Sequence, residues 1–241
     1  MKNIKRVAAT GLSAVAISVL IGGGAASACS MSNADGGEYS EHNSGTAQTT
    51  GYHEHMGMGG DQQAQDEWHA KLDAALREHA AVGVAALKAE ALKEPDVAAL
   101  TNVVNQNSLM ISELVDQGYP GVHDEFLELW QSHIGYYKEY LVAAQAKDEA
   151  GKQQAKDKLA MFTNELSELL ANNSNDELDE AALQESLAMH GNQVTTIMDY
   201  FVDGNYDGAW MTAHEAYEHM GMVANMLAGG AQHEDNDYMR L

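Results

Sequence analysis

The sequence predicts an all-α protein, an antiparallel bundle of about six helices. Apolar residues recur at spacings of three and four from about residue 62 to residue 228, which is the helical period. The only two prolines, Pro95 and Pro120, fall between such segments, and no alternating strand pattern competes with them. A helical bundle domain over 62–230, roughly 165 residues long, is large enough to bury a core.

The first 28 residues have the pattern of an export signal peptide. Lys2, Lys5 and Arg6 precede an apolar run over 7–21, and a stretch of small residues ends at Ala28. The run is short for a membrane span, and no other stretch reaches the roughly 20 apolar residues that a spanning helix needs. We therefore expect residues 1–28 to be removed and the protein to be extracytoplasmic, at the cell envelope.

The only cysteine of the chain, Cys29, directly follows this signal. A single cysteine cannot form an internal disulfide, so its position needs another explanation. The stretch Ala26-Ser27-Ala28-Cys29 resembles a bacterial lipoprotein box, although Ala26 stands where such boxes usually carry Leu. The resemblance implies a lipid on Cys29 and a membrane-anchored lipoprotein. The alternative is a simple cleavage site followed by an incidental cysteine, in which case the protein is secreted.

Residues 29–61 are rich in Gly, Ser, Asn and Thr and have no apolar period, which predicts a flexible tether. The tether contains the pentapeptide Glu-His-Met-Gly-Met at 54–58, which recurs at 218–222. Imidazole and thioether groups form a soft ligand set that suits Cu(I), so the segment is a candidate for metal capture. The alternative is a polar linker that happens to contain these side chains. The candidate capture residues are His53, His55, Met56 and Met58.

Six helices are expected after the tether. The second begins after Pro95, with Asp96 in a capping position. A turn at 118–121 and a break at 172–176 separate further helices, and Gly229-Gly230 ends the last one. The expected ranges are about 63–93, 96–117, 122–147, 150–172, 179–203 and 206–228 for the helices, and 231–241 for an acidic tail.

The chain also carries a faint internal duplication. The tripeptide Ser-Glu-Leu occurs at 112–114 in the second expected helix and at 167–169 in the fourth. Each copy precedes a helical histidine by about 20 residues, and the pair Glu-His recurs at 78–79 and 218–219. These matches suggest two related halves of the bundle.

Four of the expected helices each place one histidine in the middle of an apolar stripe. An apolar residue lies three positions before each histidine and another lies eight after it, so each imidazole points with the core side chains. If consecutive helices are antiparallel, the first, third and fifth are parallel, and their histidines can share one layer with that of the sixth. The four residues are His79, His133, His190 and His219.

Burying four imidazoles together is unfavourable unless something binds them. Neutral imidazole is a common nitrogen ligand of transition metals, so we expect a metal site, with copper favoured and iron or zinc as alternatives. Glu215, one turn before His219, and Met222, three residues after it, are further candidate ligands. His69, His123 and His214 are left outside the inner set. The competing interpretation is four independent core histidines, each hydrogen-bonded to a carbonyl or carboxylate.

The charge balance excludes some partners. The chain has 13 basic and 36 acidic residues, a formal charge of −23. Three of the basic residues belong to the signal, so the mature chain is close to −26. Such a surface repels nucleic acid and anionic lipid headgroups and attracts cations. Metal ions therefore remain as expected partners, and we expect contact with the membrane only through the lipid on Cys29. The alternative is that the acidic residues form an ordinary solvated surface.

Bundles with inner metal-binding histidines bring to mind hemerythrin-like and ferritin-like proteins, but the motifs of those families are missing. No pair of His-x-x-x-His or His-x-x-x-Glu segments lies on the helices where those families need them, and Glu-x-x-His does not occur on two helices. The closing sequence Glu-His-Met-x-Met-x-x-x-Met-Leu at 218–227 resembles a family of uncharacterised exported bacterial helical proteins. This resemblance covers 66–230 and implies an all-helical fold, but no particular activity.

The expected function is transition-metal binding for buffering, trafficking or sensing at the cell envelope. A first alternative is an oxidase-type enzyme, in which the same histidines with Glu215 or Glu218 hold ions and Tyr136 or Tyr137 is the redox partner. A second is a structural or interaction module with ordinary core histidines. The bundle has no cysteine, no Gly-x-Ser-x-Gly elbow and no Cys-x-x-Cys-His haem motif, so the sequence favours a binding protein over an enzyme.

Overall fold

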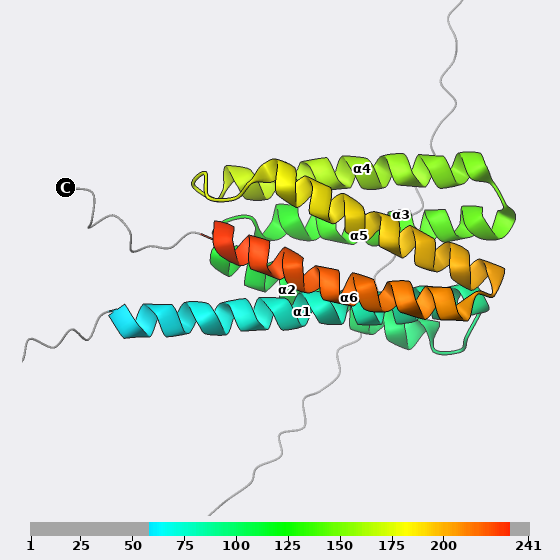
Figure 1. Ribbon diagram of the computed structural model, residues 1–241, viewed down its shortest axis with the longest axis horizontal. Coiled ribbons are helices and arrows are strands. Elements are labelled where there is room, and N and C mark those ends of the chain that lie inside the picture. Colours follow the sequence, from blue (N-terminus) through cyan, green and yellow to red (C-terminus); the bar gives the residue numbers. More distant parts are fainter. Residues whose placement is uncertain (1–57, 232–241) are drawn as a thin grey trace, which may run out of the picture. The chain divides into compact units, whose positions relative to one another are not determined.

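A computed structural model describes residues 58–231 of the chain, with side chains from residue 62 onward. These residues form six α-helices and no strand (Figure 1). The all-α class and the number of helices predicted from the sequence are therefore confirmed. The helices are α1 (Met58–Leu92), α2 (Val97–Gly118), α3 (His123–Ala146), α4 (Glu149–Asn172), α5 (Glu180–Asp203) and α6 (Tyr206–Gly230).

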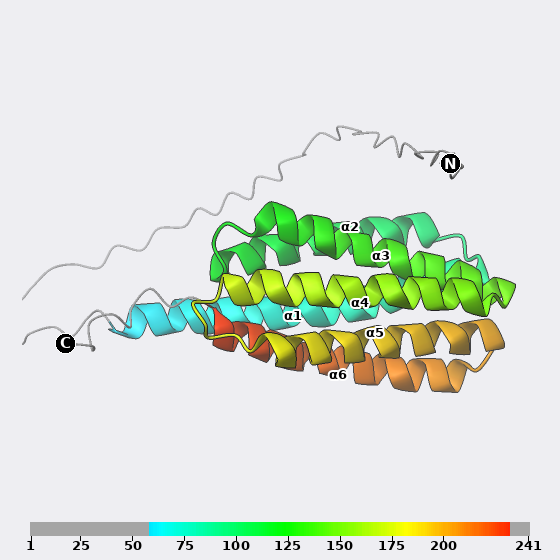
Figure 2. The same cartoon turned by 90° about the horizontal axis from the view of Figure 1, so that it is seen from above.

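Three helices occupy the centre of the bundle and three cover it. The helices α1, α3 and α5 all contact one another, whereas α2 bridges α1 and α3, α4 bridges α3 and α5, and α6 bridges α5 and α1 (Figure 2). Short connections make consecutive helices antiparallel, so the three central helices run in the same direction. This arrangement is what places residues from the middle of α1, α3 and α5 at one level.

The helix boundaries agree with the sequence expectation to within two residues, with one exception. Helix α1 begins at Met58, five residues before the expected start, so Met58 belongs to a helix rather than to the tether. Hydrogen bonds one turn apart support this extension, because Gln62 donates to Asp66 (2.9 Å) and Gln63 donates to Glu67 (3.1 Å).

The caps of the helices differ from one another. Asp96 occupies the N-cap position of α2 as expected, but its side chain makes no capping hydrogen bond. The side chains of Asp148, Asp179 and Asn205 do cap α4, α5 and α6, each accepting from a backbone N–H three residues later. Gly204 ends α5 in the left-handed conformation, with φ of 74°, which glycine adopts without strain.

The core follows the apolar stripes read from the sequence. All eight apolar residues that flank the four stripe histidines are buried. The Tyr119 hydroxyl, fully buried at the end of α2, donates to the Leu227 carbonyl of α6 (2.7 Å), which ties these two helices together. Among the helices described, none is both long and apolar enough to cross a membrane.

Helices α1 and α2 meet closely at one glycine. The Trp68 indole N–H donates to the Leu114 carbonyl (2.8 Å), and this bond holds the ring over Gly118. A Cβ at Gly118 would overlap Trp68 ring carbons, and the ring is rigid. The packing of α1 on α2 at this end of the bundle therefore requires glycine at position 118.

We expect Gly118→Ala to destabilise the protein by about 1–3 kcal/mol, because overpacking a rigid contact outweighs the better helix propensity of alanine. The measurement is urea unfolding followed by circular dichroism. Gly135→Ala is the matched control, because a Cβ at this exposed glycine of α3 meets nothing within 4 Å, and it should stabilise by about 0.5–1 kcal/mol. Equal effects of the two substitutions would contradict the packing argument.

Candidate functional site

The structure brings the four stripe histidines together in the interior of the bundle. His79 of α1, His133 of α3, His190 of α5 and His219 of α6 are 5%, 2%, 7% and 4% exposed. The rings of His79 and His133 lie 5.5 Å apart, centre to centre. His190 is close enough to both His79 and His219 for their charges to lower its pKa. We call these four residues the histidine cluster.

One nitrogen of every ring in the histidine cluster has no partner. The Nδ1 atoms of all four residues are buried and make no hydrogen bond within the part of the chain that the structure describes. Buried polar atoms are nearly always hydrogen-bonded in folded proteins, and an unsatisfied one costs about 1–3 kcal/mol. The competing interpretation, in which each histidine bonds a carbonyl or carboxylate, fits His219 through its Nε2 and His133 through the Trp130 backbone, but it leaves the Nδ1 atoms without described partners.

His219 shows which tautomer is present. Its Nε2 lies 2.8 Å from the Ser186 carbonyl oxygen and 3.1 Å from the Ser186 hydroxyl. A carbonyl oxygen only accepts, so Nε2 carries the proton and donates it, and Nδ1 of the neutral ring has a free lone pair. Ser186 lies one turn before His190 on α5. The same turn of α5 therefore carries His190 and, through Ser186, orients the ring of His219.

Burial keeps three residues of the histidine cluster, His79, His133 and His190, uncharged at neutral pH. Desolvation lowers the pKa of His79 to about 4 and that of His190 to about 3. Desolvation also lowers the pKa of His133 well below its usual range, and the neighbouring charges of His79 and His190 lower it further. Neutral imidazoles have lone pairs, and these are what a metal ion binds.

Aromatic side chains pack around the cluster. The Trp130 ring centre is 4.8 Å from those of both His79 and His133. Phe162 of α4 stacks on His133 at 4.6 Å, and the Tyr137 ring meets His133 edge-on at 5.5 Å. The indole N–H of Trp130 is also buried without a described partner. The rings are thus held in an apolar environment that strengthens any electrostatic interaction made inside it.

A pocket of about 80 Å³ opens beside three of the cluster histidines, His79, His133 and His190. Its walls come from α1, α2, α3 and α5, and most of their surface is apolar. Lys138 and Glu90, half-exposed residues of α3 and α1, lie in its lining with nitrogen and oxygen 4.0 Å apart. A much smaller cavity on the other side of His133 and His190 is lined by Met220 and Tyr137, among others.

The four rings are not arranged as a closed ligand set. Among residues 62–231, no group of three or more His, Cys, Asp or Glu side chains is positioned to hold a metal ion. The structure therefore contains four neighbouring histidines whose Nδ1 atoms have no partner among the described residues, without convergence of their nitrogens on one point.

Two other candidate ligands lie away from the cluster. Glu215 is exposed and Met222 is 53% exposed on the outer face of α6. The reason is that His219 lies at one edge of the buried face of α6. The rest of that face, formed by Ala216, Met220 and Val223, lies to one side of His219. Glu215 and Met222 lie on the opposite side of His219 and face solvent. The structure therefore does not place Glu215 or Met222 beside the buried rings of the cluster.

The residues that sequence reasoning missed are Ser186 and Met220. Met220 is fully buried and lines the small cavity beside His133 and His190, so it is the thioether closest to the cluster's interior. The sequence feature that could have predicted the burial of Met220 is the apolar stripe of Ala216, Met220 and Val223, which are spaced by four and three residues. Ser186 carried a weaker signal, since it precedes His190 by one turn.

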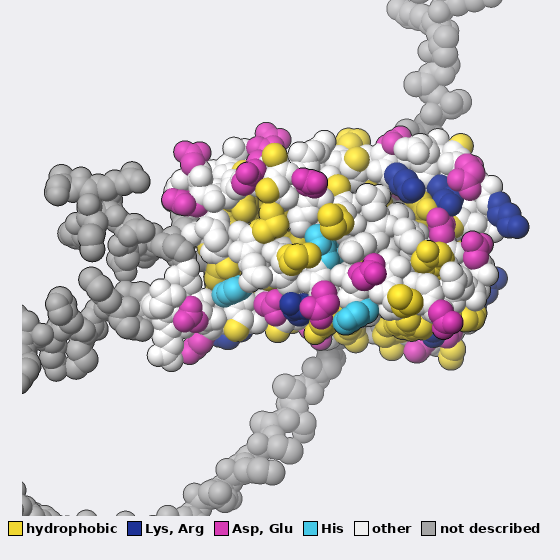
Figure 3. Space-filling model, viewed as in Figure 1, with side chains coloured by type: hydrophobic (Ala, Val, Ile, Leu, Met, Phe, Trp, Pro, Cys, Tyr) yellow, Lys and Arg dark blue, Asp and Glu magenta, His cyan; other side chains and the backbone are white. Residues whose placement is uncertain are grey.

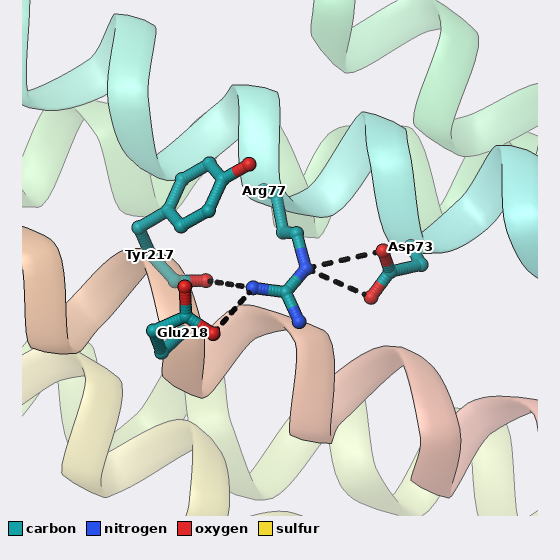
Figure 4. Close-up of polar contacts among 4 residues, drawn as sticks. All are labelled: Asp73, Arg77, Tyr217 and Glu218. Carbon is teal, nitrogen blue, oxygen red and sulfur yellow. Dashed lines mark hydrogen bonds and ion pairs between the residues drawn. The ribbon is translucent and has the colours of Figure 1, made fainter.

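The pentapeptide Glu-His-Met-Gly-Met at 218–222 has a distinct environment at each of its positions. Glu218 accepts from the Arg77 guanidinium of α1 (3.0 Å), which also bonds Asp73 and reaches the Tyr217 carbonyl (Figure 4). A Cβ at Gly221 would overlap this guanidinium, so glycine lets Arg77 lie against α6. His219 and Met220 face inward and Met222 faces outward. The repeat on α6 is thus explained by packing as well as by the cluster.

The remaining histidines are separate from the cluster. His123 is the first residue of α3 and bonds Asp124 (2.8 Å), and His214 is exposed. His69 is half-buried near the start of α1, and its Nε2 has no partner in the described part of the chain. The predictions for Cys29, His53, His55 and Met56 lie outside the described residues, as does the side chain of Met58.

The fold and the site together define a six-helix bundle with a buried histidine cluster at the junction of its three central helices and α6. Comparison of the chain with models of protein families, with curated proteins and with solved structures finds no match. Any function assigned to the site must therefore come from its chemistry.

Proposed function

We propose that the bundle binds a transition-metal ion through the histidine cluster, with copper favoured and iron or zinc as alternatives. The observation that carries the proposal is the set of four buried Nδ1 atoms, on four neighbouring helices, that have no partner within the described part of the chain. Leaving all four unsatisfied would cost several kcal/mol in the free protein. Coordination to a metal ion would satisfy two or more of them at once.

The protonation state supports the same proposal. All four rings are buried, and desolvation favours the neutral form that binds copper, iron and zinc. The bond from His219 Nε2 to the Ser186 carbonyl is of the kind that orients metal-binding histidines, because it leaves the lone pair on the other nitrogen. Met220 would add a soft thioether beside His133 and His190, which favours copper.

Binding through this cluster requires the rings to turn. Because no three potential ligands are now placed around one point, metal binding would rotate at least one imidazole about its side-chain bonds. The adjacent pocket provides space for this movement. We therefore expect metal uptake to be accompanied by a change in the surroundings of Trp130, which touches both His79 and His133.

We further propose that the protein acts at the cell envelope, in metal buffering, trafficking or sensing. The export signal and Cys29 support an extracytoplasmic, lipid-anchored chain. On the bundle face in Figure 3, carboxylates are spread over the surface and basic side chains are few. Such a surface raises the local concentration of cations. His53, His55, Met56 and Met58 would capture the ion before it enters the bundle.

The test is metal uptake by the purified mature protein. After incubation of the metal-free protein with Cu(I), Cu(II), Zn(II) or Fe(II) at micromolar concentration and removal of free metal, elemental analysis should find bound copper. A variant with all four cluster histidines changed to alanine should bind only what the tether holds. Quenching of Trp130 fluorescence in a Trp68→Phe, Trp210→Phe background reports the bundle site directly.

A tether variant with His53, His55, Met56 and Met58 changed to alanine is the matched control, and it should retain the Trp130 response. If the four-alanine variant does not fold, the single substitutions His133→Leu and His190→Leu replace it. Absence of uptake by the wild-type protein, or an unchanged Trp130 response in the cluster variants, would refute the proposal.

A further inference from the structure

The pocket beside the histidine cluster has properties of its own. It is formed because α1 presents the small residues Ala80, Gly83 and Ala86 along the side that faces α2 and α3. Larger residues at these positions would fill the space. Opposite them lie Val104 of α2 and Val194 of α5, and the rings of His79, His133 and His190 complete the buried end.

The size of the pocket limits its occupant. A volume of about 80 Å³ corresponds to about five to eight water molecules, since one water needs about 10–15 Å³ by this kind of measure. A molecule the size of a dissolved gas fits, whereas a nucleotide or a sugar does not.

The lining indicates an uncharged guest. Most of the surface that lines the pocket is apolar, although Thr101 and Asn105 of α2 are also part of the lining. The Nδ1 atoms of the three histidines are covered rather than exposed to the pocket. Lys138 and Glu90 lie in the lining with opposite charges, so they do not attract an ion of either sign. An ion in such a pocket would lose hydration without a matching partner, and water would lose hydrogen bonds against the aliphatic walls.

We propose that this pocket binds a small, uncharged, apolar molecule of the size of a dissolved gas. The guest would lie against His79, His133 and His190, so the pocket would bring it to the residues of the proposed metal site. Occupancy of the pocket depends on its volume and walls and not on a bound metal, so the inference stands apart from the proposed function.

The test uses xenon as the probe and the metal-free mature protein. Xenon added to protein with labelled methyl groups should produce saturable NMR shifts of Val84, Val104 and Val194, which line the pocket. The methyls of Leu170 and Leu178, which are buried outside the pocket, should not shift. Water filling the pocket, with no xenon-dependent shift, would overturn the proposal.

Gly83→Phe is the blocking variant, because a Cβ at this position meets nothing within 4 Å and the side chain can enter the pocket. It should abolish the xenon shifts, and Ala80→Leu, which fills the buried end, should do the same. Gly135→Phe is the matched control on an exposed position and should leave the shifts unchanged. Equal xenon binding by Gly83→Phe, Ala80→Leu and the wild type would overturn the assignment to this pocket.

Metal uptake measured on the same preparations separates this inference from the proposed function. Xenon binding without metal uptake would support the proposed gas-binding pocket and refute the proposed metal site. Metal uptake without xenon binding would support the metal site and refute the gas-binding pocket.

Discussion

Lowering the pH from 7 to 5 is expected to destabilise the metal-free bundle by about 2 kcal/mol for each of His79 and His190, and His133 acts in the same direction. Their pKa values are lowered by burial, to about 4 for His79, about 3 for His190 and well below the usual range for His133. The unfolded chain, in which these histidines titrate near 6.5, therefore binds more protons than the folded protein below that pH. Stability is fully present above pH 6.5 and is lost as the pH falls.

The expected loss, about 4 kcal/mol for His79 and His190 at pH 5 with a further loss from His133, is comparable to the entire stability of many domains. Urea unfolding at pH 7, 6 and 5 measures it. Most carboxylates have an ordinary pKa near 4 and stay ionised over this interval, so the numerous acidic residues contribute little.

A variant with His79, His133 and His190 changed to leucine isolates this effect. It should show little dependence on pH between 7 and 5, whereas His123→Leu, at a residue outside the cluster, should behave like the wild type. A wild-type bundle that is equally stable at pH 7 and pH 5 would show that the cluster is hydrated or already charged when folded.

His133→Leu should have opposite effects on stability and on metal binding. His133 is 2% exposed and is packed against Trp130, Phe162 and Tyr137, and its Nδ1 has no described partner. Leucine has a similar volume and no polar atom to satisfy, so the metal-free variant should be more stable than the wild type by about 1–2 kcal/mol. The variant should lose the additional stability that copper confers on the wild type.

That additional stability is measurable, because a ligand at 100 times its Kd stabilises the folded state by about 2.7 kcal/mol. Thermal unfolding with and without copper gives the difference for each variant. Leu166→Ala, a substitution at a fully buried residue without a metal-binding atom, should lose about 2–5 kcal/mol but retain the effect of copper. A His133→Leu variant that is less stable without metal and still responds to copper would show that His133 is a structural residue.

Much of the fold could be read from the sequence because helix periodicity is local. The stripes through Leu72, Leu76, Ile111 and Leu141 define helices whose buried faces require no knowledge of their partners. The one helix boundary that was predicted wrongly is the start of α1. The first turns of this helix consist mainly of polar residues, so no apolar period marks them in the sequence. The missing capping bond of Asp96 is a matter of side-chain direction that residue type alone does not determine.

The candidate site was predictable only in part. The burial of His79, His133, His190 and His219 follows from their positions on apolar stripes, and their proximity follows from antiparallel order. The exposure of Glu215 and Met222 was not predictable, because helical spacing places them near His219 but does not say where the buried face of α6 ends. Contacts with α1 and α5 determine that edge, and they turn Met220 inward instead.

The sequence by itself determined that this chain is a six-helix bundle and that four of its helices carry an inward-facing histidine. The period of the apolar residues is sufficient for that, because it depends on each helix alone. Only the tertiary structure decided that α1, α3 and α5 form the centre and that the four Nδ1 atoms are buried without partners. It also decided that small residues of α1 leave a pocket beside them. These features arise from how the faces of different helices fit together, and such packing is not encoded in the period of any one helix.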